Sequence, residues 1–146
     1  MQIKEIIKNK ADFMDILLIG DEDENMINKY INQSTIFALY VNSTLTSVCA
    51  IIKVDNETAE IKNLSTYPEY QNRGYALIDF VCNKYKTEFK YLILGTGENN
   101  KTLKFYKKRG FQEIHRLKNF FIDNYSHPIY ENGKQLIDMI YLKKIL

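Results

Sequence analysis

The chain has 146 residues, of which 26% are charged, and its formal net charge is +2. This length suits one domain around one core, so residues 1–146 are predicted to form a single domain. The near balance of charges disfavours a nucleic-acid-binding protein, in which Lys and Arg gather on one face. No apolar run approaches the roughly 18 residues of a membrane span and the N-terminus lacks a signal-peptide core, so we expect a cytoplasmic protein without membrane contact.

The hydrophobic pattern predicts a strand over residues 1–7, helices over 10–19 and 25–33, and strands over 35–41, 45–54 and 58–66. From residue 73 the period changes, because Leu77, Val81 and Tyr85 recur at helical spacing. A strand over 91–94, a helix over 99–109 capped by Gly110, and closing strands over 111–122 and 135–142 complete the chain. Asn132-Gly133 is the turn signal expected between those last two strands.

This order of elements predicts an α+β (mixed α/β) fold. Antiparallel hairpins come first, and the later strand–helix–strand passage requires at least one parallel, right-handed crossover. We expect a twisted mixed sheet of about six or seven strands with about four helices. Cys49 and Cys82 lie in apolar segments and are predicted to be buried free thiols. His115 and His127 form no spacing known from zinc sites, so no metal is expected.

The segment IKNLSTYPEYQNRGYA, residues 61–76, carries the strongest chemical signal. A strand runs into Pro68, and a short loop over 71–76 opens a helix. The first turn of a helix leaves N–H groups unpaired and concentrates partial positive charge, while Gly74 would let main chain approach a phosphate. Arg73 adds a side-chain cation. The segment predicts a pyrophosphate cradle, although Gly74 on its own is equally compatible with a plain turn.

The motif QNRGYA resembles the Gln/Arg-x-x-Gly-x-Gly/Ala signature of the GNAT superfamily of N-acetyltransferases, with Ala76 where many members have Gly. The segment ENNKTLKFYKKRGF is similar to the family's second motif, and together the two motifs lie within residues 59–112. The resemblance implies the GNAT fold and acetyl-CoA as co-substrate. It assigns cofactor binding to the loop residues Gln71, Asn72, Arg73, Gly74, Tyr75 and Ala76.

The resemblance also implies how the cofactor is held. In this family the strand before the loop splays from the next parallel strand, and the pantetheine arm pairs with main chain in the gap. Here Leu64, Ser65 and Thr66 would supply those main-chain groups, and an amide near Leu64 would stabilise the oxyanion. The side chains of Ser65 and Thr66 are also compatible with an ordinary strand end.

Tyr106 matches the tyrosine of the family's Phe-Tyr pair, close to the cofactor sulfur. A thiol titrates near about 8.5 and a phenol near about 10, so a tyrosine can protonate the leaving thiolate across a small gap in acidity. Tyr106 is also an i, i+3 partner of Leu103 and would pack there. Asn99 matches the cofactor-contacting asparagine, with a helix N-cap as its alternative role and Asn100 as a rival.

The general base is open among three residues. Glu60 lies eleven residues before Gln71, the spacing of the catalytic glutamate in histone-acetylating members, but it is also compatible with an outward-facing strand position. Asp123 and His127 are alternatives, because the closing segment often borders the acceptor pocket in similar folds. The acidic run over 21–24 would attract a cationic amine such as a polyamine, or would be a solvated turn with helix-start acids.

The sequence therefore predicts an acetyl-CoA-dependent N-acetyltransferase acting on a primary amine, small or on a protein. The alternatives are a catalytically silent acetyl-CoA sensor of the same fold and a generic α/β anion-binding or interaction module. Tyr106, Asn99 and the loop over 71–76 favour the enzyme over the sensor. Lys and Tyr side chains near the termini would support a homodimer through the last strand.

Overall fold

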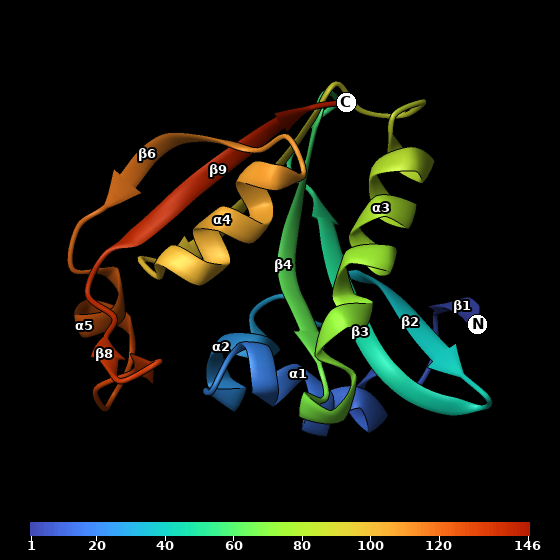
Figure 1. Cartoon of the computed structure of the whole chain (residues 1–146), viewed down its shortest axis with the longest axis horizontal. Helices are drawn as coiled ribbons and strands as arrows, with labels where there is room; N and C mark the ends of the chain where they lie inside the picture. The colour runs from blue at the N-terminus through green and yellow to red at the C-terminus, as the bar shows by residue number, and fades with distance from the viewer.

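A twisted seven-stranded sheet organises the computed structural model, which describes residues 1–146 apart from the side chain of Asn72. The spatial order is β1-β2-β3-β4-β5-β9-β6, and a separate two-stranded hairpin pairs β7 with β8 (Figure 1). The β4–β5 pair is parallel and the other pairs are antiparallel, which confirms the predicted mixed sheet and crossover. The strands are β1 (Gln2–Ile6), β2 (Thr35–Val41), β3 (Thr44–Lys53), β4 (Thr58–Thr66), β5 (Tyr91–Gly97), β6 (Gln112–Leu117), β7 (Tyr130–Glu131), β8 (Lys134–Gln135) and β9 (Met139–Ile145).

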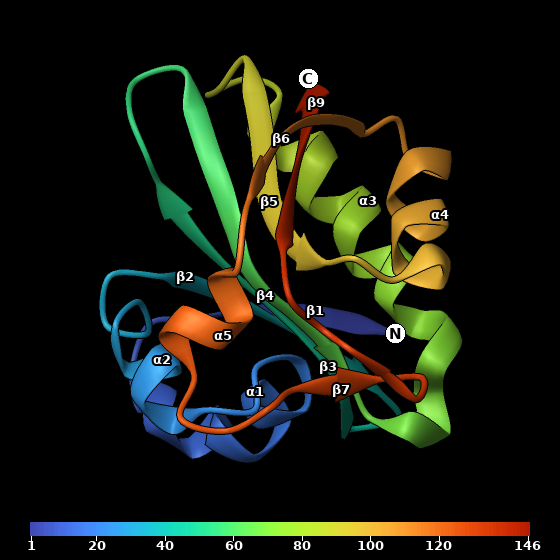
Figure 2. The same cartoon turned by 90° about the vertical axis from the view of Figure 1, so that its left-hand side faces the viewer.

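Helices cover both faces of the sheet. Figure 2 shows α3 and α4 on one side of the strands, with α1, α2 and α5 gathered at one end toward the other side. The α-helices are α1 (Met14–Gly20), α2 (Glu24–Asn28), α3 (Gly74–Tyr85), α4 (Asn100–Lys108) and α5 (Phe120–Asn124), and 3-10 turns cover Lys10–Phe13 and Pro68–Arg73. Among the residues that the structure describes, every helix is too short or too polar to cross a membrane.

Two hydrophobic clusters lie on opposite faces of the sheet because β3 sends alternate side chains to each. Cys49 and Ile51 pack under α3 and α4, where Leu77, Val81 and Leu103 complete the larger cluster. Val48 and Ala50 point the other way, into a cluster with α1 and α2. The two cysteines are free thiols, as predicted.

The end of the chain departs from the sequence-based prediction. Residues 111–122 do not form one strand, because Asn119 adopts a left-handed conformation with φ of 59° and the chain turns into α5. The prediction of a strand over 135–142 is likewise wrong in its bounds, since β9 begins at Met139. Asn132-Gly133, both at positive φ, turns the small β7–β8 hairpin rather than joining the two closing strands. An Asn-Gly turn is compatible with a short local hairpin and with a turn between longer strands, and tertiary contacts decide between the two.

Candidate functional site

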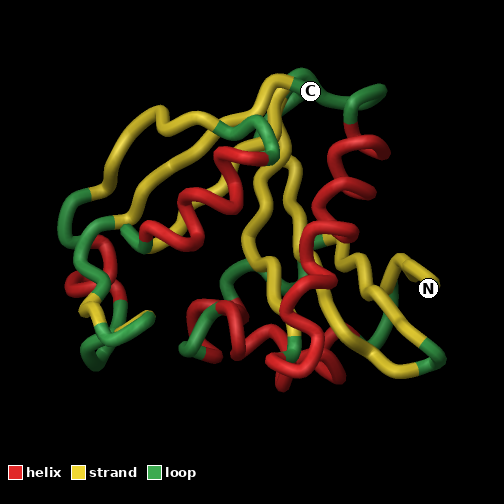
Figure 3. The backbone as a smooth tube through the Cα atoms, in the orientation of Figure 1, coloured by secondary structure: helices red, strands yellow, loops and turns green.

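The strand β4 carries a bulge at the point where it leaves β5. Ala50 pairs with Asn63 while the next residue, Ile51, pairs with Ile61, so Lys62 is an extra residue on β4. The parallel ladder with β5 runs only from the Thr58–Tyr91 pair to the Ile61–Leu94 pair. Beyond it β5 pairs with β9 alone, and the strands separate toward α1 and α2 (Figure 3). Main-chain groups of residues 62–66 that do not bond β3 therefore face an opening in the sheet.

The helix α3 begins beside this opening without a side-chain cap. Its N-cap residue is Arg73, which makes no capping hydrogen bond from its side chain. Gly74 is buried in ordinary helical geometry, with φ of −60°, so a turn requirement does not explain the glycine. A Cβ there would lie 3.0 Å from Thr66 Oγ1. Gly74 thus allows α3 to lie close to β4.

The other predicted loop residues surround that helix start. Gln71 and Arg73 are exposed, and Ala76 packs partly into the core. The Tyr75 ring lies on the outside, with the Arg109 guanidinium 4.9 Å from its centre. Asn72 lies outside the described side chains, so its predicted contact has no structural account.

The side chains at the end of β4 have structural partners. Ser65 is buried and bonds the side chain of Asn63, on the α1 side. Thr66 Oγ1 and Ser47 Oγ share a hydrogen bond of 3.0 Å. Leu64 packs against the cluster under α3 and α4. These residues therefore offer main chain rather than side chains to the opening.

Tyr106 lies on the inner face of α4, with only 8% of its surface exposed. Its ring meets Phe105 and Phe111 edge to face, with centroids 5.1 and 5.6 Å away. Burial raises the pKa of its phenol, so the hydroxyl stays protonated at neutral pH. Tyr106 is thus part of the core, and its role as proton donor stays a prediction.

The start of α4 adds a second polar group. Asn99 is its N-cap and accepts a hydrogen bond from the Lys101 N–H at 3.0 Å. Asn99 also lies beside Glu131 of β7, an exposed residue whose carboxyl pKa is raised by partial desolvation. Asn100 is exposed. Glu131 was missed by sequence reasoning, since only the folded hairpin brings it to α4.

Glu60 is buried rather than outward-facing, with 8% of its surface exposed. Its Oε2 atom accepts a hydrogen bond from the Tyr141 hydroxyl at 3.0 Å and lies 3.3 Å from Lys62 Nζ. It borders a cavity of about 200 Å³ between α2, β4, β9 and α5. The geometry is compatible with a base, although the carboxylate is already ion-paired.

A second cavity, of about 140 Å³, adjoins the first beside the opening in the sheet. Both are lined by Asp21, Lys62, Gly95, Tyr125 and Met139. The Asp21 carboxylate accepts hydrogen bonds from Tyr125, at 2.8 Å, and from Tyr30, at 3.4 Å. Sequence reasoning considered Asp21 only within the acidic run and did not find its two tyrosine partners.

The two alternative bases lie elsewhere. Asp123 is exposed on α5 and lines neither of these cavities. His127 is exposed and borders a separate hollow formed by α5 and the segment after it. Of the carboxylates considered as bases from the sequence, Glu60 alone lines one of these two cavities, and Asp21 lines both.

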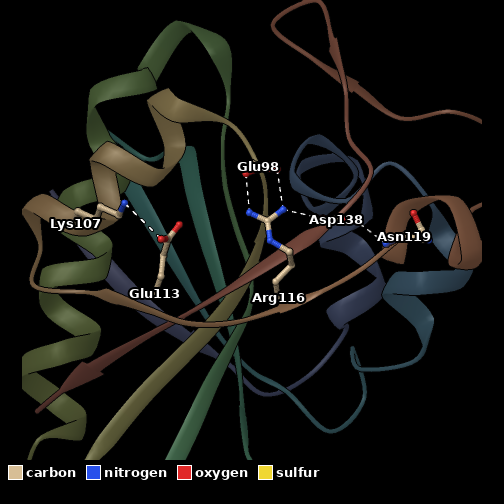
Figure 4. A network of polar contacts seen from close by, with 6 residues as sticks. All are labelled: Glu98, Lys107, Glu113, Arg116, Asn119 and Asp138. Carbon is tan, nitrogen blue, oxygen red and sulfur yellow. Dashed lines mark hydrogen bonds and ion pairs between the residues drawn. The ribbon is translucent and has the colours of Figure 1, made fainter.

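An exposed ionic network holds the closing segment against the site (Figure 4). Arg116 of β6 contacts Glu98 at 2.8 Å and Asp138 at 2.7 Å. Asp138 also accepts a hydrogen bond from the Asn119 N–H, at the start of α5. Arg116 thus links the loop before α4 to the helix that carries Phe120, a residue of the larger cavity's wall.

Comparisons with known proteins agree with this geometry. Residues 32–113, more than half of the chain, match the family model of the acetyltransferase (GNAT) domain. The uncharacterized N-acetyltransferase YvbK of Bacillus subtilis is 26% identical over 132 residues, which cover 88% of this chain and 85% of that protein.

Two solved structures superpose over the whole fold. A GNAT family acetyltransferase from Elizabethkingia anophelis, with acetyl-CoA bound, is 33% identical with a TM-score of 0.93, covering 99% of this chain and 97% of that one. A Bacillus subtilis acetyltransferase in complex with CoA is 25% identical with a TM-score of 0.87, covering 99% and 98%. The resemblance drawn from the two motifs is confirmed, and this chain belongs to the GNAT acetyltransferase family.

Proposed function

We propose that this chain is an N-acetyltransferase that moves an acetyl group directly from acetyl-CoA to a primary amine in a ternary complex. One observation carries the proposal: the β4–β5 opening has the start of α3, which lacks a side-chain cap, on one side and a largely apolar and aromatic cavity on the other. A long anionic thioester and a small acceptor could enter from opposite sides and meet there.

The residues present suit acetyl-CoA. Main-chain N–H groups at the start of α3, with Arg73, would hold the pyrophosphate, because helix N-termini bind anions. The unpaired edge of β4 past Ile61 would pair with the pantetheine amides. An N–H near Leu64 would stabilise negative charge that develops on the acetyl oxygen during attack.

Tyr106 would protonate the departing thiolate. The raised pKa of its phenol widens the gap to a thiol in water. The thiol that forms in the same buried surroundings also has its pKa raised by desolvation, so the difference between the two pKa values becomes smaller again. The proton would move from the phenol to sulfur as the carbon–sulfur bond breaks.

Glu60 is the proposed base for the attacking amine. Its carboxylate lines the acceptor-side cavity, and Lys62 and Tyr141 fix its orientation. Proton removal would pass directly or through one water, since amines are mostly protonated at neutral pH.

Turnover of acetyl-CoA with a panel of primary amines tests this proposal. Mass spectrometry should find an N-acetylated product and free CoA in equal amounts. Binding of acetyl-CoA without a product from any amine or peptide would favour the silent sensor. Absence of acetyl-CoA binding to the folded protein would contradict both readings.

A further inference from the structure

Asp21 occupies the junction of the two acceptor-side cavities. It follows α1 directly and contributes a carboxylate to the wall that both cavities share. The preceding residue, Gly20, lies against β4, where a Cβ would come within 2.7 Å of Asn63 Oδ1. Asp21 is therefore held next to the stretch of β4 that follows the bulge.

A chain of hydrogen bonds ties this carboxylate to β4 and to the closing segment. The Asn63 side-chain amide donates to Leu17 O at 2.9 Å and to the Tyr30 hydroxyl at 3.0 Å. Tyr30 in turn donates to Asp21, and Tyr125 donates to its other oxygen. Residues far apart in the sequence thus fix the carboxylate from two sides.

The Asp21 carboxylate has no ion-pair partner within the described part of the chain, whereas Glu60 in the same cavity is paired with Lys62. Burial raises the pKa of Asp21 in spite of the hydrogen bonds from the two tyrosines. A desolvated carboxylate without a cation is costly, and phenol donors offset only part of that cost. A ligand cation at this position would supply the missing charge.

The rest of the acidic run has other roles. Asp23 is the N-cap of α2 and accepts a hydrogen bond from the Asn25 N–H at 2.8 Å. Glu24 is exposed in the first turn of that helix, and Glu22 is exposed beside the smaller cavity. Of the four acidic residues over 21–24, Asp21 is therefore the one that we consider as a binding site for a cationic acceptor.

The side chains that line the larger cavity indicate what kind of acceptor it would hold. Apolar and aromatic side chains dominate the lining of the larger cavity, and its other charges are Glu60 with Lys62, and Lys29 at the exposed rim. Aromatic faces attract an ammonium group as well as an apolar body. The apolar and aromatic wall residues are Met26, Tyr30, Ile52, Ile61, Phe120, Tyr125, Met139 and Tyr141.

We propose that Asp21 binds the ammonium group of the acceptor, and that the acceptor is a small primary monoamine with an apolar body. The single nitrogen binds as the ammonium ion and attacks only after it has passed a proton to Glu60, which lines the same cavity. The proposal rests on the proposed acetyltransferase function and adds the class of its acceptor. In the wall of the larger cavity Asp21 is the one carboxylate without an ion-pair partner, because Glu60 is paired with Lys62, so a second ammonium group has no equivalent partner there. Glu22 and Glu131 border only the smaller cavity.

The test compares wild type, Asp21→Asn and the matched control Glu24→Gln, with 2-phenylethylamine as the probe. Loss of a buried charge partner should raise the KM for the amine about 30-fold in Asp21→Asn. The KM for acetyl-CoA should stay within about twofold, and Glu24→Gln should behave as wild type. Inhibition by the uncharged analogue 2-phenylethanol should be the same in all three proteins, because it makes no use of the carboxylate.

Tyr125→Phe is a second variant for the case that Asp21→Asn does not fold, which thermal melts would show. It removes the 2.8 Å hydrogen bond that orients the carboxylate, and should raise the amine KM severalfold without changing inhibition by the alcohol. An unchanged amine KM in the folded variants would overturn the role of Asp21. A higher kcat/KM for 1,5-diaminopentane than for 2-phenylethylamine would overturn the monoamine class.

Calorimetry separates failure of this proposal from failure of the enzyme function. Binding of 2-phenylethylamine to the CoA-saturated protein needs no turnover and gives the same comparison of variants. Amine binding that depends on Asp21 without any acetylation would contradict only the enzyme function. Turnover with the same amine KM in wild type and Asp21→Asn would contradict only the role of Asp21. Failure of 2-phenylethylamine to bind or react at all would also overturn the role of Asp21.

Discussion

Replacement of Gly74 by Asp tests whether the start of α3 holds the cofactor. Ligand at about 100 times its Kd adds roughly 2.7 kcal/mol to the free energy of unfolding. Unfolding entropies near 2.1 cal/mol/K per residue give about 0.3 kcal/mol/K for a chain of this length. Saturating acetyl-CoA should therefore raise the melting temperature of the wild type by about 9 °C.

The variant places a carboxylate where the pyrophosphate would approach Gly74. Two unit charges about 4 Å apart repel by about 4 kcal/mol at the effective dielectric constant of a protein surface. Even half of this value weakens binding about 30-fold. At the same acetyl-CoA concentration the rise in melting temperature should fall below about 3 °C.

Differential scanning fluorimetry with and without acetyl-CoA provides the measurement. Asn83→Asp is the matched control, since it adds the same charge at an exposed position later in α3 and should keep the full rise. Gly74→Ala is the milder variant: Thr66 Oγ1 must yield by a few tenths of an ångström from 3.0 Å, and the rise should be intermediate. A rise of about 9 °C in Gly74→Asp would refute the placement of the pyrophosphate at this helix.

Three further changes probe the acid, the packing behind the acceptor cavity and the ionic network. Tyr106→Phe keeps the ring contacts and should lower kcat at least about 100-fold at unchanged melting temperature; steady-state kinetics that match wild type would exclude Tyr106 as the acid. Gly20→Ala forces a Cβ within 2.7 Å of Asn63 Oδ1 and should cost about 1–3 kcal/mol, a fall of about 3–10 °C by calorimetry, and no fall would contradict the close packing of α1 on β4. The Asn119 N–H and, to a smaller extent, Arg116 lower the pKa of Asp138, so the stabilising effect of the Arg116–Asp138 pair is present at neutral pH and lost as the pH falls through that lowered pKa. The melting temperatures of Arg116→Gln and wild type should differ at pH 7 and converge in acid, and a difference that persisted at low pH would contradict this linkage.

The elements that sequence reasoning predicted well are those with strong local signals. The apolar stripe of Leu77, Val81 and Tyr85 places α3 correctly. Gly110, at a positive φ of 93°, follows the end of α4, as predicted. The closing segment was predicted less well. Residues 111–122 end in the short apolar run Phe-Phe-Ile, which suits either strand or helix, and the left-handed Asn119 before it starts a helix there.

The candidate site shows the same division. The loop over 71–76 and Tyr106 were found because they carry motifs within short stretches of chain. The partners of Asp21 were not found from the sequence. Tyr125 lies 104 residues away, and the hydrogen bond from the Tyr30 hydroxyl joins two side chains that no sequence motif relates. Glu60 was found by spacing, but its burial and its hydrogen bond from Tyr141, 81 residues away, were not.

The sequence by itself determined the family, the mixed fold and the helix that begins at Gly74, since helical period, turn chemistry and the two motifs are local properties of the chain. Only the tertiary structure decided where β4 parts from β5 and which carboxylates face the opening. Strand pairing and cavity walls join residues with no fixed separation in sequence. Burial and the pKa changes that follow from it arise only when those residues meet.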